Sequence, residues 1–178
     1  MPMQQRLLSA DADLTRRLRV AEKPGMLRNL AVIFAHSGDS WLWIPALGLV
    51  WLFGPPEWKA VAAWMLAGVL VTALIVLAIK FSVRRRRPEG EWGELYRRTD
   101  PHSFPSGHAA RAVMLAVLAL GLTPPWLGVL LLFWASLVIL ARVAMGVHYL
   151  SDVLAGAALG ALLGLIYLAL IPQLSSLA

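Results

Sequence analysis

Residues 58–81 read WKAVAAWMLAGVLVTALIVLAIKF, an apolar run whose charged residues are Lys59 near its start and Lys80 near its end. At 1.5 Å per residue, a helix of this length crosses the roughly 30 Å hydrocarbon core of a bilayer. The composition of the chain agrees, because 59% of its 178 residues are hydrophobic, 15% are charged and the mean hydropathy is +0.69. We therefore expect an integral membrane protein.

Further apolar runs on either side of this stretch have the composition of membrane helices. The predicted spans are residues 41–53, 58–81, 106–122, 126–143 and 149–171. The last of them carries Gly156, Gly160 and Gly164 at a spacing that suits close helix packing. The predicted fold is all-α, a polytopic transmembrane helix bundle of about five spans, and we expect residues 1–178 to form a single membrane-embedded domain.

The N-terminal segment, residues 1–25, has a different pattern. From Gln4 to Glu22, leucines alternate with arginines and aspartates at a helical period, which predicts an amphipathic helix lying in the membrane interface. Residues 27–34 are apolar but too short to span, and the polar residues 36–39 follow them. We expect a short helix tucked against the bundle there.

A polar loop, residues 82–105, contains the run Arg84-Arg85-Arg86-Arg87. With the predicted spans, this loop, the N-terminal helix and the connection 142–148 lie on one face of the membrane. The opposite face receives Glu57, Lys59 and an uncharged C-terminal tail. Polar segments that are distant in sequence therefore converge, and we expect the functional site where they meet.

Composition also excludes several classes of function. The chain has no cysteine, which rules out disulfides, thiolate metal sites and a cysteine nucleophile. Its formal net charge is +6, but the basic residues flank apolar runs and do not alternate with aromatic residues on a polar face. We therefore expect no nucleic-acid partner, and an anionic lipid or phosphate instead.

His148 and Asp152 are four residues apart at the start of the last span, so both lie on one helix face. A carboxylate there can accept a proton from one imidazole nitrogen and leave the other nitrogen nucleophilic. Taken alone, the pair is a weak signal, and it is more typical of an interfacial histidine followed by an aspartate that caps a helix N-terminus.

Pro105-Ser106-Gly107-His108 stands where the polar loop enters the third span. Free backbone N–H groups at a helix start bind phosphoryl oxygens, and His108 is suited to protonate a departing alkoxide. The alternative is an ordinary helix start, with Ser106 as the N-cap residue and His108 at the interface.

Lys80, Arg87 and Arg142 stand at the membrane boundaries, where fixed cations can stabilise the charge of a phosphoryl group in transfer. Arg84–Arg86 are interpreted as surface or lipid-headgroup contacts. Arg111 either contacts the substrate or pairs with an acid such as Asp100. Asp39, His36 and His102 are attributed to a loop turn and to solvent exposure.

These residues resemble the three-part signature of the type-2 phosphatidic acid phosphatase superfamily of membrane lipid phosphatases. Lys80 with Arg87 and Pro88 matches Lys-x6-Arg-Pro, residues 105–108 match Pro-Ser-Gly-His, and Arg142, His148 and Asp152 match Ser-Arg-x5-His-x3-Asp. The match departs at Ala141, where the family usually has serine, and we expect this to tune activity. The signature covers residues 80–152.

The resemblance implies that His148 attacks phosphorus to give a phosphohistidine, that Asp152 supports it, and that His108 protonates the leaving oxygen and then activates water. It further implies that the phosphate is held by five residues: Lys80, Arg87, Ser106, Gly107 and Arg142. Family members work without a metal, and we predict no metal and no cofactor.

The expected activity is hydrolysis of a lipid phosphate, such as phosphatidylglycerophosphate, phosphatidic acid or a polyprenyl diphosphate. The alternatives are a lipid phosphotransferase with the same phosphohistidine and a non-catalytic membrane protein that binds anionic lipid. We expect the chain in the cell membrane. The sequence leaves open the face on which the site opens and the oligomeric state, since the basic residues favour the cytoplasm whereas bacterial relatives often face outward.

Overall fold

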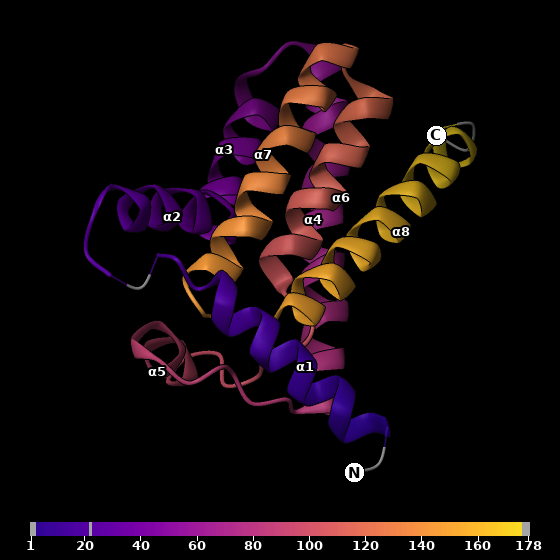
Figure 1. Cartoon of the computed structure of the whole chain (residues 1–178). Helices are drawn as coiled ribbons and strands as arrows, with labels where there is room; N and C mark the ends of the chain where they lie inside the picture. The colour runs from indigo at the N-terminus through magenta and orange to yellow at the C-terminus, as the bar shows by residue number, and fades with distance from the viewer. Residues whose placement is uncertain (1–2, 22, 176–178) are drawn as a thin grey trace.

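The computed structural model describes residues 3–21 and 23–175, and these residues form helices joined by short loops (Figure 1). The helices are α1 (Met3–Leu18), α2 (Met26–Ser37), α3 (Ser40–Phe53), α4 (Pro56–Val83), α5 (Glu91–Arg97), α6 (Gly107–Leu122), α7 (Pro125–Ala144) and α8 (Leu150–Ser175). The predicted all-α bundle is confirmed.

The membrane-spanning helices fall into two length classes. Within the described residues, α4, α7 and the Leu150–Ile171 part of α8 are long and apolar enough to cross a membrane. The other two predicted spans, α3 and α6, are apolar but only 14 and 16 residues long. At 1.5 Å per residue they measure about 21 and 24 Å, shorter than a typical hydrocarbon core.

Helix α6 is the central helix of the bundle, and α4, α7 and α8 pack around it (Figure 1). Its small residues are buried from Ala109 to Ala119. The main apolar cluster joins Met65 of α4 and Met114 of α6 to Leu163 of α8. The start of α6, which carries the predicted phosphate-binding motif, is therefore held from three sides.

Glycines let α8 approach α6 closely. A Cβ added at Gly160 would lie 2.1 Å from the carbonyl oxygen of Ala110, and one at Gly156 would lie 2.4 Å from that of Ser106. Such distances exclude any side chain, so the predicted small-residue packing of this span is confirmed. The contact places Asp152, one turn before Gly156, beside the start of α6, where its carbonyl accepts the Ser106 N–H at 2.9 Å.

Helix α1 docks by its polar side. Its Asp11 accepts hydrogen bonds from the Ser151 N–H at 3.1 Å and from the Ser151 hydroxyl, and Thr15 accepts the Leu150 N–H at 3.0 Å. The apolar side, with Leu8, Leu14 and Leu18, is exposed. This division fits the predicted interfacial helix. The helix ends at Leu18, earlier than the predicted end at Glu22, a residue that lies outside the described part of the chain.

The predicted convergence of polar segments is also observed. The Ala21 N–H donates to the Ala144 carbonyl, so the N-terminal segment lies against the connection that follows α7. Helix α2 confirms the short helix expected after it and packs against α7. The polar loop contains one helix that was not predicted, α5, which begins with Glu91 and Glu94 and ends with Arg97, charges that suit a helix dipole.

Candidate active site

His148 lies in the connection between α7 and α8, and its side chain is buried. Its Nε2 is 3.2 Å from Nη1 of Arg87, and the same Nη1 donates to the Val147 carbonyl at 2.9 Å. Burial, reinforced by the charges of Arg87 and Arg142, holds the pKa of His148 well below its usual value of 6.5. The imidazole is therefore neutral at physiological pH, with a lone pair available for attack.

Asp152 stands behind this histidine, as its four-residue spacing predicted. Its Oδ2 lies 3.6 Å from Nδ1 of His148, which is too long for a hydrogen bond, and it accepts the Tyr149 N–H at 2.9 Å. Its Oδ1 accepts from Nη1 of Arg85 at 2.8 Å. The interpretation of Arg85 as a surface or headgroup contact was therefore wrong: Arg85 bridges Asp152 and Asp11.

The two cations of the first motif part share one carboxylate. Asp100 accepts from Nζ of Lys80 and, at 2.7 Å, from Nη2 of Arg87, whose Nε donates to the Asp100 carbonyl at 2.6 Å. Both cations are buried, whereas 41% of the Asp100 side chain is exposed. Asp100 thus fixes two positive side chains beside His148 from a more exposed position.

Arg142 projects from the last turn of α7 and is fully buried. Its Nη1 donates to the Tyr96 hydroxyl at 3.0 Å, while its Nε and Nη2 have no hydrogen-bond partner among the described residues. Both arginines stack on the Tyr96 ring. Cζ of Arg142 lies 4.6 Å from the ring centroid, and Cζ of Arg87 lies 5.3 Å from it. Sequence reasoning missed Tyr96, because an aromatic residue in a polar loop has no distinguishing pattern.

Ser106 and Gly107 begin α6, and Ser106 accepts the Ala109 N–H at 3.5 Å. The N-cap role proposed as the alternative for Ser106 is therefore present. A Cβ on Gly107 would lie 3.3 Å from Val76 of α4, a tight contact, so glycine suits the position. Both residues border the same end of α6 as His108.

His108 faces a residue from outside the signature. Its Nε2 lies 2.5 Å from Oδ1 of Asp39, in the turn between α2 and α3. Burial raises the pKa of Asp39, but hydrogen bonds from His108 and His36 outweigh it and hold that pKa well below its usual range. The loop-turn explanation of Asp39 was incomplete. In the sequence, the feature that could have indicated a role for Asp39 is its position as a carboxylate between two apolar segments.

Arg111 lines the same cavity as Lys80 and His108, so the predicted substrate contact stays a prediction, and its hydrogen bonds go to a turn and not to Asp100. Its Nε and Nη2 donate to the Gly38 carbonyl, and its Nη1 donates to the Ser40 hydroxyl at 2.5 Å. It therefore fastens α6 to the turn that carries Asp39. His102 lies in the loop, where its ring meets Phe81 edge-on, and it pairs with Arg86 through an isolated backbone bridge.

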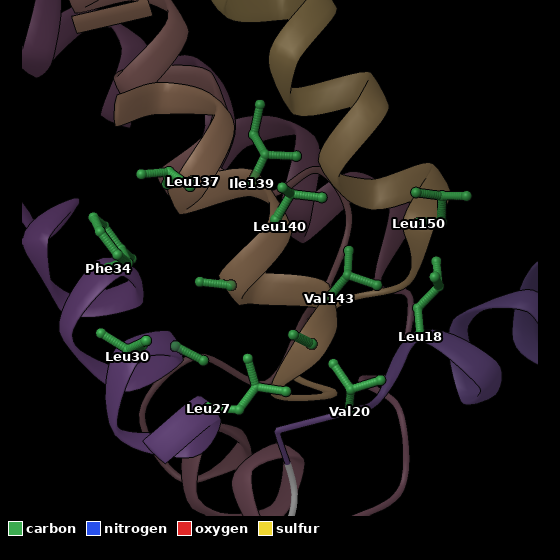
Figure 2. A pocket seen from close by; sticks show the side chains of 13 residues that line it. Leu18, Val20, Leu27, Leu30, Phe34, Leu137, Ile139, Leu140, Val143 and Leu150 are labelled. Atoms are coloured by element: carbon green, nitrogen blue, oxygen red, sulfur yellow. The ribbon is translucent and has the colours of Figure 1, made fainter. Parts of the chain in front are cut away.

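Two cavities of about 430 Å³ lie on different sides of this centre. The first joins Lys80, Asp100 and His108 to an apolar wall formed by Trp41, Ala73, Val76 and Leu77. The second is an apolar groove between α2 and α7 (Figure 2), to which Ala141 and Val143 contribute while Arg142 between them turns into the polar centre. Of these two cavities, the first brings Lys80 and His108 next to an apolar surface.

The sequence profile of the PAP2 superfamily matches residues 61–175, which include every residue of the three motif parts. The chain belongs to the PAP2 superfamily. The resemblance drawn from the motifs is thereby confirmed. The decaprenylphosphoryl-5-phosphoribose phosphatase of Mycobacterium tuberculosis is 35% identical over 156 residues, which cover 83% of this chain and 81% of that protein.

Other PAP2-type proteins are similar over comparable lengths. The undecaprenyl-diphosphatase of Sulfolobus acidocaldarius is 30% identical over 138 residues, 75% of this chain and 66% of that protein. The crystal structure of a transmembrane PAP2-type phosphatidylglycerolphosphate phosphatase from Bacillus subtilis superposes with a TM-score of 0.76 at 25% identity, covering 94% of this chain and 87% of that one. This likeness extends beyond the profile match to the N-terminal helices of the PAP2 fold.

Proposed function

We propose that this PAP2 protein is a metal-independent lipid phosphatase that works through a phosphohistidine at His148. The observation that carries the proposal is the environment of Arg142. Two of its guanidinium nitrogens, Nε and Nη2, have no hydrogen-bond partner within the described part of the chain, although the side chain is fully buried and its charge acts on the buried, neutral His148. Buried donors are rarely left unpaired, and a phosphoryl group supplies the acceptor oxygens that they need.

The proposed reaction has two steps. Nε2 of His148 attacks phosphorus, the bond from phosphorus to the lipid oxygen breaks, and His108 gives that oxygen a proton. Water then gives a proton to His108 and attacks the phosphohistidine, which releases phosphate and frees His148. Lys80, Arg87 and Arg142 neutralise the phosphoryl oxygens, while the Ser106–Gly107 helix start supplies N–H groups.

A lipid substrate suits the cavity beside Lys80. Its polar end holds Lys80 and His108, and its wall continues along α4 as Ala73, Val76 and Leu77. A headgroup phosphate at the cations leaves the lipid chain to run along these apolar side chains. Among lipid phosphates, the names of the three similar proteins favour a polyprenyl diphosphate, a sugar phosphate on a polyprenylphosphoryl carrier, or phosphatidylglycerophosphate as the class to test.

The test is phosphate release in detergent, with excess EDTA, from phosphatidylglycerophosphate, phosphatidic acid and undecaprenyl diphosphate. We expect EDTA-resistant release that His148→Ala abolishes. A lipid carrying ³²P in the transferred phosphate should label wild-type protein, in an acid-labile and base-stable form, on rapid quenching. Release that needs a divalent cation, or that survives His148→Ala, would overturn the proposal.

The proposal also places the protein in the cell membrane, and the absence of cysteine makes the sidedness measurable. Arg98→Cys puts a thiol at an exposed position of the polar loop, and Glu57→Cys puts one on the opposite face. A membrane-impermeant maleimide added to intact cells should label one variant and spare the other. Labelling of Arg98→Cys assigns the site to the outer face, and labelling of Glu57→Cys assigns it to the inner face.

A further inference from the structure

The turn between α2 and α3, residues 37–40, lies outside the signature and the profile match, yet it is built against the catalytic end of α6. Arg111 of α6 holds Gly38 and Ser40, and Nε1 of Trp134 in α7 donates to the Ser37 hydroxyl at 2.8 Å. A Cβ at Gly38 would lie 3.3 Å from the His108 ring and 3.1 Å from a Val138 methyl group. The turn is thus fixed in place from two helices.

This turn aims one carboxylate at His108. Oδ1 of Asp39 lies 2.5 Å from Nε2 of His108, while Oδ2 accepts from Nδ1 of His36 and Nε1 of Trp41, both at 2.9 Å. The Asp39 side chain is only 14% exposed, so these bonds form in a partly desolvated setting where charge-assisted hydrogen bonds are strong. Both oxygens are engaged, which leaves the carboxylate a single orientation.

The contact determines what each ring nitrogen of His108 can do. Because the Nε2–H group donates its hydrogen bond to the Asp39 carboxylate, Nδ1 is the nitrogen left to exchange a proton with the substrate. The negative Asp39 carboxylate beside Nε2 also offsets part of the cost that burial imposes on the protonated ring, which is the form that a general acid needs. The arrangement parallels the way a carboxylate orients a catalytic imidazole elsewhere.

We infer that Asp39 is a positioning residue for the proposed phosphatase reaction: it fixes the ring of His108 so that Nδ1 delivers the proton to the departing lipid oxygen. The inference rests on the proposed function. In the first step the proton leaves Nδ1 as the bond from phosphorus to oxygen breaks, and in the second step water returns a proton to Nδ1. Asp39 keeps its Nε2 hydrogen bond in both steps and is not consumed.

The test compares Asp39→Asn on two substrates of the same enzyme, both assayed as kcat/KM, which reports the steps up to phosphoryl transfer. A lipid phosphate leaves as an alkoxide and needs a proton, and we expect a loss of about 10- to 100-fold. p-Nitrophenyl phosphate leaves as a stable anion, and we expect a change below about threefold because no proton is needed. His108→Ala should show the same asymmetry, and Asp39→Glu should recover part of the lipid activity.

The ratio between the two substrates is independent of how much of the variant is folded. Asp13→Asn is the matched control, since Asp13 is an exposed carboxylate of α1 whose side chain is 62% exposed. If Asp39→Asn lowers kcat/KM equally on both substrates, the inference is overturned and Asp39 has only a structural role. Failure of wild-type protein on both substrates would overturn the proposed function instead.

Discussion

Nη1 of Arg85 lies 2.8 Å from Oδ1 of Asp152, and Nη2 of the same guanidinium lies 2.7 Å from Oδ2 of Asp11. One arginine of the polar loop therefore joins the carboxylate behind His148 to the N-terminal helix. Asp152 is completely buried and the Arg85 side chain is 18% exposed. A buried carboxylate that loses its charged partner destabilises the protein. The arginine run therefore contributes to the site twice, since Arg87 lies beside His148 and Arg85 holds Asp152.

Replacing Arg85 should weaken catalysis without removing any phosphate contact. Arg85→Gln loses charge-assisted bonds worth about 1.5–3 kcal/mol, which corresponds to roughly 10- to 100-fold in kcat if the loss falls on the orientation of His148. Arg84→Gln is the control, because Arg84 is exposed and bonds to its own helix end. Equal kcat for the two variants, measured by phosphate release, would contradict the role of Arg85.

Tyr96 should matter through its ring more than through its hydroxyl. Tyr96→Phe removes one hydrogen bond to Arg142 and keeps the stacking surface, whereas Tyr96→Leu removes both and loosens Arg87 as well. Cation–π contacts contribute about 0.5–2 kcal/mol each when partly desolvated. We expect kcat/KM to fall only severalfold in Tyr96→Phe and more steeply in Tyr96→Leu. The reverse order would mean that the hydroxyl contacts the substrate.

The pH profile should report the depressed pKa of His148. Protonation removes the lone pair, so activity falls as the pH falls through that pKa, and a lowered pKa moves the fall to pH values below 6.5. Arg142→Gln removes one of the charges that lower it, so the acid limb of kcat/KM should move toward neutral pH. Comparing both proteins on one substrate cancels the titration of the substrate. If the acid limb stays at the same pH in Arg142→Gln, a group other than His148 titrates there.

Asp11 should be a stability residue. Asp11→Asn weakens the ion pair with Arg85 and the bonds to Ser151 that hold α1 on the start of α8. A loss of about 1–3 kcal/mol corresponds to a drop of several degrees in Tm for a chain of this size. Asp13→Asn should leave Tm unchanged, because Asp13 forms an exposed pair with Arg16. Thermal unfolding in detergent distinguishes the two variants.

Gly160 should tolerate no side chain. Gly160→Ala drives a methyl group into the Ala110 carbonyl and must separate α8 from α6, which typically costs about 1–3 kcal/mol. Gly48→Ala in α3 is the matched control, since a Cβ there meets nothing within 4 Å and alanine favours a helix. We expect a lower Tm for the first variant and an equal or higher one for the second. Similar Tm values would mean that the helix contact is looser than described.

The local patterns in the sequence predicted the bundle and the positions of the signature residues. Hydropathy marks spans directly, and the four-residue spacing of His148 and Asp152 brought them close together, although His148 lies just before α8 and not on its first turn. Asp39, Tyr96 and Arg85 could not be found in this way. Their roles depend on which turn meets which helix end, and Asp39 is 69 positions away from His108. The roles of the signature residues themselves stay predictions.

The shortness of α3 has a consequence for the membrane around the enzyme. This helix of 14 residues exposes Trp41, Leu49 and Phe53 along a length of about 21 Å, beside α4 with its 28 residues. A hydrophobic surface shorter than the surrounding hydrocarbon is accommodated by thinning of the bilayer. We therefore expect the lipids that border α3 to be drawn inward at the side where Trp41 lines the cavity beside Lys80. We therefore expect the acyl-chain length of the host membrane to affect how easily a lipid headgroup reaches Lys80.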